Sequence, residues 1–162
     1  METCESFEII SRGPGRTEEL GRLLGAIVPR GTYIALCGEL GGGKTTFVRG
    51  LAVGMGATEN VSSPTFVIMK EYSGRMSLFH TDFYRLEMEY ELTGLELEDC
   101  LARGVVAAEW ADKFDPPQPA PVLALTFTWL DEDIRSIRIT PGNKTSVEIA
   151  DRYINEIKKY IG

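Results

Sequence analysis

The sequence predicts an α/β domain of three layers, with a mixed, mainly parallel sheet between helices. Apolar runs of strand length alternate along the chain with amphipathic segments of helical period, and this alternation is typical of parallel sheets covered by helices. Near the C-terminus, two alternating segments at 122–130 and 136–140 flank the acidic residues 131–133 and predict an antiparallel hairpin. At 162 residues the chain fits one domain, which we place at 1–162.

The first half of the chain gives the clearest elements. A strand is expected at 6–11, followed by an amphipathic helix at 17–28 with Thr17 as its N-cap and acidic residues in its first turn. The β-branched and aromatic run at 32–37 predicts a buried strand, and a helix is expected at 44–55.

The second half continues the alternation with less regular spacing. The run at 104–110 is apolar throughout its first five residues, as in strands that are buried on both faces. The further elements expected here are a strand that emerges from a loop within 62–72, a returning strand at 76–84, a strongly acidic helix at 87–102, a Pro-rich connector at 115–121 and a final helix at about 144–160.

Composition and charge exclude several classes of protein. Asp plus Glu number 24 against 17 Lys plus Arg, a net charge of −7, so the chain lacks the basic surface that autonomous nucleic-acid binding needs. No stretch reaches the roughly 20 apolar residues of a membrane helix, and the acidic N-terminus is unlike a signal peptide. Three widely spaced cysteines argue against a disulfide scaffold or a thiolate zinc site. We therefore expect a cytoplasmic protein without membrane contact.

One segment, GELGGGKT at residues 38–45, points directly to a ligand. Gly38, four further residues and then Gly43-Lys44-Thr45 form the Walker A pattern, between an apolar strand and a helix. The glycines of such a P-loop let backbone amides face a β-phosphate, and the following helix directs its positive end at the same group. The expected fold is therefore a three-layer P-loop NTPase-type domain. The expected nucleotide-binding residues of this segment are Gly38, Glu39, Leu40, Gly41, Gly42, Gly43, Lys44, Thr45 and Thr46.

The expected ligand is ATP with Mg²⁺. A guanine-specific site usually carries Asn-Lys-x-Asp, and the nearest segment here, at 143–146, lacks the acid. Lys44 would hold the β- and γ-phosphates, and Thr45 would offer its hydroxyl to Mg²⁺. Asp82 and Glu109 each end an apolar strand and are candidates for holding the metal and orienting the attacking water. The sequence leaves open which of the two contacts the metal.

Other residues near these motifs have two interpretations each. Thr65 either senses the γ-phosphate, as switch loops do, or is a turn residue beside Pro64, and its position favours the turn. A lone histidine such as His80 is more often a structural hydrogen-bonding residue than a base. Arg85 pairs either with phosphate or with nearby acids, and Trp110 either packs in the core or lies next to the nucleotide.

Four blocks of sequence together resemble one family. GELGGGKTT, SSPTF, HTDFYR and EW occur in this order across about residues 32–112, and their order and spacing are similar to those of the TsaE family. Its members are small bacterial ATPases of tRNA threonylcarbamoyladenosine synthesis. The resemblance implies a P-loop α/β fold, slow or no ATP hydrolysis by the chain alone, and hydrolysis that resets or remodels a complex.

The resemblance also implies partners. TsaE proteins act with TsaB and TsaD, which transfer a threonylcarbamoyl group to adenosine 37 of tRNA. If another subunit holds the tRNA, this chain contacts tRNA only indirectly and needs no basic surface of its own. We expect a monomer for the chain alone.

The resemblance assigns site residues position by position. Asp82 and Glu109 become the catalytic carboxylates, which also form the metal site together with Thr45. The residues that fall beside the nucleotide or in its switch-like loop are Ser63, Thr65, Arg85 and Trp110, whereas His80 and Tyr84 receive no defined role.

The chain departs from the family pattern at three positions. Glu39, Gly42 and Ala111 stand where Asp, Ala and Pro are more common in the family. The first two differences are mild, and the third affects the turn after Glu109-Trp110. Residues 113–162 carry no motif of the family.

Two other functions would use the same loop. A small-molecule or nucleoside kinase usually has an Arg-rich lid over the phosphates, but the segment 86–104 holds only Arg103 and is mostly acidic. A nucleotide-sensing adaptor could discard the hydrolytic carboxylates, whereas this chain has both, together with Thr45. The ATPase is therefore the favoured function and the kinase is the alternative.

Overall fold

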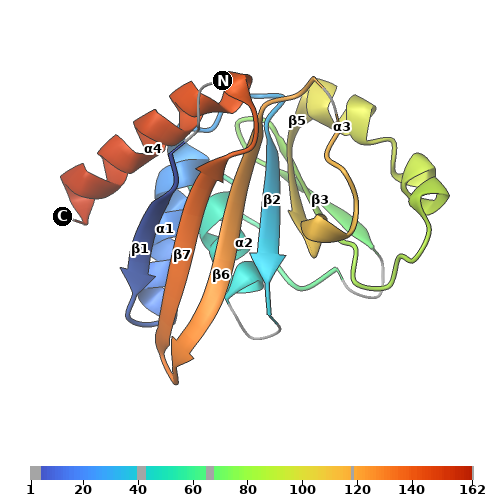
Figure 1. Ribbon diagram of the computed structural model, residues 1–162. Helices are drawn as coiled ribbons and strands as arrows, with labels where there is room; N and C mark the ends of the chain where they lie inside the picture. The colour runs from blue at the N-terminus through green and yellow to red at the C-terminus, as the bar shows by residue number, and fades with distance from the viewer. Residues whose placement is uncertain (1–4, 40–42, 65–67, 118, 162) are drawn as a thin grey trace.

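A seven-stranded mixed sheet forms the middle layer of the computed structural model, in the order β1-β7-β6-β2-β5-β4-β3 (Figure 1). The structure describes residues 5–39, 43–64, 68–117 and 119–161. The strands are β1 (Phe7–Ser11), β2 (Tyr33–Gly38), β3 (Met69–Ser73), β4 (Ser77–Asp82), β5 (Gly104–Glu109), β6 (Val122–Asp131) and β7 (Ile134–Pro141). The helices are α1 (Pro14–Ile27), α2 (Lys44–Gly54), α3 (Leu97–Arg103) and α4 (Val147–Tyr160), with short 3₁₀ segments at Glu89–Leu95, Ala111–Lys113 and Lys144–Ser146.

The direction of the strands confirms the predicted sheet. The four strands β6, β2, β5 and β4 pair in parallel, whereas β7 and β3 pair antiparallel to their neighbours at the two sides. β1 pairs antiparallel with β7 and so has the same direction as the parallel strands. β6 and β7 form the predicted antiparallel hairpin.

Helices cover the two faces of the sheet with separate apolar clusters. The central strand β2 contributes to both, because Ile34 and Leu36 belong to the cluster that includes α1, α2 and α4, whereas Tyr33 and Ala35 belong to the cluster that includes α3. Figure 1 shows α1 and α2 behind β1, β7, β6 and β2. The apolar composition of residues 32–37 therefore reflects burial on both faces.

The start of α1 differs from the sequence prediction. α1 begins at Pro14 after Gly13, so Thr17 lies inside the helix and is not its N-cap. Proline is favoured in the first turn of a helix because it has no amide hydrogen, and the amides of this turn have no acceptor within the helix. The hydroxyl of Thr17 instead shares a hydrogen bond with Ser11 Oγ at 2.7 Å, which joins α1 to the end of β1. The acidic residues Glu18 and Glu19 consequently lie beyond the first turn.

The acidic helix expected at 87–102 is divided in two. A 3₁₀ segment ends at Leu95, Glu96 takes a left-handed conformation at φ 50°, and α3 begins at Leu97. In a continuous helix, residues two positions apart face different sides. The break lets both Leu95 and Leu97 pack against the same apolar cluster, which explains why the helix is interrupted here.

The helices α1 and α2 are parallel and their backbones lie very close together. A Cβ atom added to Gly21 would lie 2.1 Å from Phe47 O, and one added to Gly50 would lie 1.8 Å from Glu18 O. Gly25 and Gly54 continue the same contact one helical turn further on. The contact aligns the two helices in the same direction, so that both N-termini lie at the same end of the domain.

We expect Gly50→Ala to lower the free energy of unfolding by about 2–3 kcal/mol, because the new methyl group would overlap the α1 backbone. The measurement is urea unfolding followed by circular dichroism. Gly15→Ala is the matched control, since a Cβ on this α1 residue meets no atom within 4 Å, and it should leave stability unchanged or raise it by up to about 1 kcal/mol. Equal stabilities for the two variants would contradict the proposed close contact.

Candidate functional site

The P-loop begins where β2 ends and closes where α2 begins. Gly38 has φ +128° and a Cβ there would lie 2.2 Å from Phe127 O, so the end of β2 requires glycine next to β6. Gly43, the N-cap of α2, has φ +100°, which also favours glycine. The amides of the first turn of α2 have no partner within the helix and suit an anion. Leu40, Gly41 and Gly42 lie outside the described residues.

The side chain of Lys44 lies in the middle of this site. Its Nζ donates to Gly38 O at 2.7 Å and to Glu39 O at 3.0 Å, and it lies 4.4 Å from the centre of the Trp110 ring. Lys44 is only 5% exposed. Burial lowers the pKa of its ammonium group, and the negative charge of Glu109 opposes this shift. The ammonium is thus held by two backbone carbonyls and an aromatic ring.

Thr45 contacts one of the two predicted carboxylates. Its hydroxyl lies 3.1 and 3.0 Å from the two carboxylate oxygens of Glu109, at the end of β5. His80 of β4, which is fully buried, donates from Nε2 to Glu109 Oε2 at 2.5 Å. The Glu109 carboxylate is therefore fixed from both sides, by a hydroxyl of α2 and an imidazole of β4.

Asp82 lies beside Glu109 on the neighbouring strand, because β4 and β5 are parallel with these two residues in register. Both carboxylates are buried, at 5% and 4% exposure. Asp82 Oδ1 accepts a hydrogen bond from the amide of Tyr84 at 2.8 Å, which ends β4 in a tight turn. The two acids thus lie together at the carboxyl end of the parallel strands, as the sequence predicts.

Trp110 takes a strained backbone conformation next to these acids. Its φ is +57° and ψ is +36°, a left-handed conformation that is rare for an aromatic residue. The ring lies over Lys44 and 5.1 Å from the ring of Tyr84. The turn ends β5 at Glu109 and directs the indole towards the P-loop, so Trp110 lies at the candidate site.

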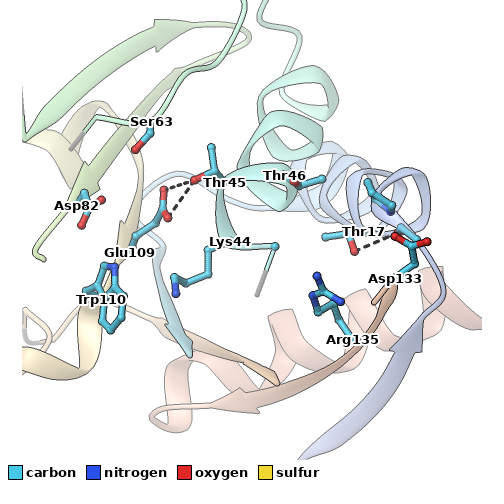
Figure 2. A pocket seen from close by; sticks show the side chains of 13 residues that line it. Thr17, Lys44, Thr45, Thr46, Ser63, Asp82, Glu109, Trp110, Asp133 and Arg135 are labelled. Carbon is cyan, nitrogen blue, oxygen red and sulfur yellow. Dashed lines mark hydrogen bonds between the residues drawn. The ribbon is translucent and has the colours of Figure 1, made fainter. Parts of the chain in front are cut away.

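These residues surround a cavity of about 290 Å³. Figure 2 shows Lys44 near its centre, with Ser63, Asp82, Glu109 and Trp110 on one side and Asp133 and Arg135 on the other. The lining residues are Gly13, Pro14, Thr17, Gly43, Lys44, Thr45, Thr46, Ser63, Asp82, Glu109, Trp110, Asp133 and Arg135.

Known proteins are similar to this chain in sequence and in fold. The model of the family described as "Threonylcarbamoyl adenosine biosynthesis protein TsaE" matches residues 11–138. The chain belongs to the TsaE family. The TsaE protein of Nostoc sp. strain PCC 7120 is 42% identical over 135 residues, which cover 80% of this chain and 82% of that protein. The TsaE protein of Bacillus subtilis strain 168 is 40% identical over 133 residues, with 81% and 84% covered.

A solved structure confirms the TsaE-type fold. The crystal structure of YdiB from Bacillus subtilis superposes with a TM-score of 0.80 at 27% identity, and the alignment covers 96% of this chain and 98% of YdiB. In the part of this TsaE-family chain that the structure describes, no helix is long and apolar enough to cross a membrane.

Not every predicted residue of the TsaE pattern lines the cavity. Thr46 does, whereas Glu39 is exposed and contributes only its carbonyl oxygen to the contact with Lys44. Arg85 is exposed and lies outside the lining set. Thr65 lies outside the described residues.

Two parts of the cavity wall are not among the site residues predicted from the sequence. One is the start of α1 with Gly13, Pro14 and Thr17, and the other is the tip of the β6–β7 hairpin with Asp133 and Arg135. The acidic turn at 131–133 marks a hairpin in the sequence, but only the pairing of β6 with β2 places that hairpin beside the P-loop.

The donor set of this TsaE-family site suits magnesium. Mg²⁺ usually takes one or two carboxylates together with phosphate oxygens and water, and Thr45, Asp82 and Glu109 offer oxygens at the cavity wall. Among the described residues, no group of three or more His, Cys, Asp or Glu side chains is arranged to hold a metal ion by itself. A metal here would therefore depend on a phosphate ligand, as it does in nucleotide sites.

We expect His80 and Glu109 to be coupled energetically, because the imidazole donates to a buried carboxylate. His80→Ala should cost about 1–3 kcal/mol of stability, since it leaves that carboxylate with one donor fewer. In a chain that already carries Glu109→Ala, the same substitution should cost less. Urea unfolding of the wild type, both single variants and the double variant gives the coupling free energy, and strictly additive costs would rule out a contribution of this hydrogen bond.

Proposed function

We propose that this chain is a Mg²⁺-dependent ATPase of tRNA threonylcarbamoyladenosine synthesis. The observation that carries the proposal is the contact between Thr45 and Glu109, which joins the P-loop helix to a carboxylate at the end of a neighbouring strand. A hydroxyl and a carboxylate at this position are the groups that P-loop hydrolases use for magnesium. The family and its named relatives support the assignment to this pathway.

Each residue has a role that follows from its position. The P-loop amides and the first turn of α2 bind the phosphates, and Lys44 exchanges the carbonyls of Gly38 and Glu39 for β- and γ-phosphate oxygens. Mg²⁺, when bound, neutralises charge on these phosphates and so favours transfer of the γ-phosphoryl group to water. Thr45 and Glu109 hold the metal or its water ligands.

The remaining groups of the site act on the attacking water. Asp82 lies beside Glu109 in the register of β4 and β5, which lets it orient a water molecule at the same edge of the sheet. The hydrogen bond from His80 holds Glu109 in the orientation that serves both the metal and this water. Fixed groups of this kind lower the barrier because they need not reorganise during the reaction.

We propose that TsaB and TsaD are the partners that accelerate this hydrolysis. Tyr84 is exposed, and its ring lies tilted against the ring of Trp110, which lines the cavity, so a partner can contact this side of the site. The net charge of −7 supports indirect contact with tRNA, through a partner that carries the basic surface.

A kinase is less well supported by the arrangement of charges. Arg103, the arginine of the segment where a phosphate lid would be expected, pairs with Glu71 at 3.4 Å and lies over the Phe79 ring. It does not line the cavity. The proposed hydrolase therefore fits the described site better than a γ-phosphoryl transfer to a bound acceptor.

We expect slow ATP hydrolysis by the purified chain and a large rise when the TsaB–TsaD pair of the same organism is added. The measurement is phosphate release with Mg²⁺ and with excess EDTA, and EDTA should abolish the activity. If the pair leaves the rate unchanged while ATP still binds, the partner assignment is wrong, and a search for a phosphoryl acceptor follows.

Lys44→Ala should abolish detectable ATP binding, whereas Glu109→Gln should lower the partner-activated turnover by about 10²–10³-fold and change ATP affinity much less. The reason is that the P-loop carries the binding energy and Glu109 serves the reaction. Isothermal titration and phosphate release measure the two effects. Glu71→Gln is the matched control, because it removes a carboxylate on the α3 side of the sheet that does not line the cavity. Wild-type turnover in Glu109→Gln would refute the role of this carboxylate.

A further inference from the structure

A second hollow of the molecule lies at the outer edge of the sheet. β1 is the first strand in the sheet order, at the left in Figure 1, and among the described residues no strand pairs with its outer side. A groove of about 400 Å³ lies between β1, the start of α1 and the end of α4. It shares no lining residue with the cavity that contains Lys44, so it has no part in the proposed nucleotide chemistry.

The floor of the groove is apolar. Phe7 and Ile9 of β1 and Ile161, which follows α4, are half-buried and pack against the core beneath. The buried Ile157 lies among them, and Ile10 lines the groove although it is 37% exposed. Covering apolar surface is favourable by about 25 cal/mol per Å², so apolar side chains of another segment would gain free energy here.

The backbone of β1 is open to a further strand. In an antiparallel pair, alternate residues direct their N–H and C=O groups away from the neighbouring strand, so part of the β1 backbone points away from β7. Proteins often protect such an edge with lysine or proline, but β1, FEIIS, has neither. Its one charge, Glu8, pairs at 3.0 Å with Arg138 of β7. The edge can therefore form main-chain hydrogen bonds with an extended peptide.

Positive charges lie at both ends of the groove. Arg12 and Arg16 follow the last residue of β1, and Lys158 Nζ lies 5.7 Å from the centre of the ring of Phe7, the first residue of β1. Of the described residues that line the groove, none is acidic, although the chain as a whole has a net charge of −7. Arg16 pairs with Glu19 at 3.3 Å, with side chains 41% and 38% exposed. Exposed pairs of this kind are weak, so the carboxylate of a partner can replace that of Glu19.

We propose that this groove binds an extended segment of a partner protein, which adds to the sheet as a strand beside β1. The segment has apolar residues at alternate positions and acidic residues at both ends. Its alternate apolar side chains enter the groove, since every second side chain of a strand faces the same side. One acidic end meets Arg12 and Arg16, and the other meets Lys158. A second copy of this chain is a poor occupant, because a symmetric contact through β1 would bring two basic grooves together.

The test measures the binding of two labelled nine-residue peptides to the full chain by fluorescence anisotropy. The first peptide, DEVTITVED, has the proposed pattern, and the second, KKVTITVKK, has the same centre with basic ends. We expect the acidic peptide to bind at least about tenfold more tightly, because its ends complement the charges of the groove. The preference should fall as salt is added, since the charges are exposed.

Lys158→Glu and Arg12→Glu should each weaken binding of the acidic peptide about tenfold, because each places a like charge at one of its ends. Arg152→Glu is the matched control. It makes the same change of charge at an exposed position of α4 that does not line the groove, and it should change the affinity less than about twofold. Circular dichroism and thermal melts of the three variants establish that the domain is folded in the comparison.

Methylation of the peptide amides tests the addition of a strand. A strand pairs with β1 through one of its two edges, and the amides of each edge belong to alternate residues. The acidic peptide is therefore N-methylated either at its Val and Ile residues or at its two Thr residues. We expect one of these sets to abolish binding and the other to leave it intact.

Each other result overturns the inference. It fails if neither peptide binds, if both bind equally, or if Lys158→Glu and Arg152→Glu have the same effect. It also fails if both methylated peptides bind, or if neither does, because the contact then does not have the geometry of a strand. Sedimentation of the chain alone tests the remaining occupant: a dimer that Lys158→Glu breaks would make the groove an interface between copies, against the proposal.

Discussion

The parallel register of β2, β5 and β4 is the constraint on which the site depends. In this register Leu36 pairs with Glu109, and Glu109 pairs with Asp82, so the end of the P-loop strand and both carboxylates lie at one edge of the sheet. A slip of one residue would turn each carboxylate to the other face. The apolar side chains of β5, which pack against clusters on both faces, prevent such a slip. The core therefore positions the two carboxylates.

Burying two carboxylates and a lysine together is costly unless each charge has partners. Here Glu109 contacts Thr45 and His80, and Lys44 contacts two backbone carbonyls and the Trp110 ring. The burial that lowers the pKa of Lys44 also strengthens its attraction to a phosphate, because the surrounding dielectric constant is low. The groups of the site thus stabilise one another without a ligand.

The sequence predicts those features that depend on local patterns, and it fails where distant segments meet. The glycine loop, the strand before it and the acids at the ends of β4 and β5 follow from residue types and spacing. The pairing of β1 with β7, more than 120 residues apart, has no local pattern, and neither does the position of the hairpin beside the P-loop. The sequence alone therefore places Arg135 only in a hairpin. The pairing of β6 with β2 and β7 places it at the cavity.

Local conformation also limits what a sequence can predict. The break at Glu96 and the left-handed turn at Trp110 occur at residues that seldom adopt such conformations, because packing at Leu97 and at the P-loop outweighs the local preference. Thr17 is a good N-cap by residue type, yet Pro14 starts the helix earlier. These differences arise where tertiary contacts decide between nearly equivalent local structures.

The close contact of α1 with α2 has a mechanical consequence. Because their backbones touch at Gly21 and Gly50, the two helices can neither separate nor slide without breaking that contact, and they behave as one rigid body. The N-termini of both helices border the cavity, so the wall of the cavity on this side is rigid. If the proposed hydrolysis changes the shape of the site, the change must therefore fall on the opposite side, where Tyr84 and Trp110 lie.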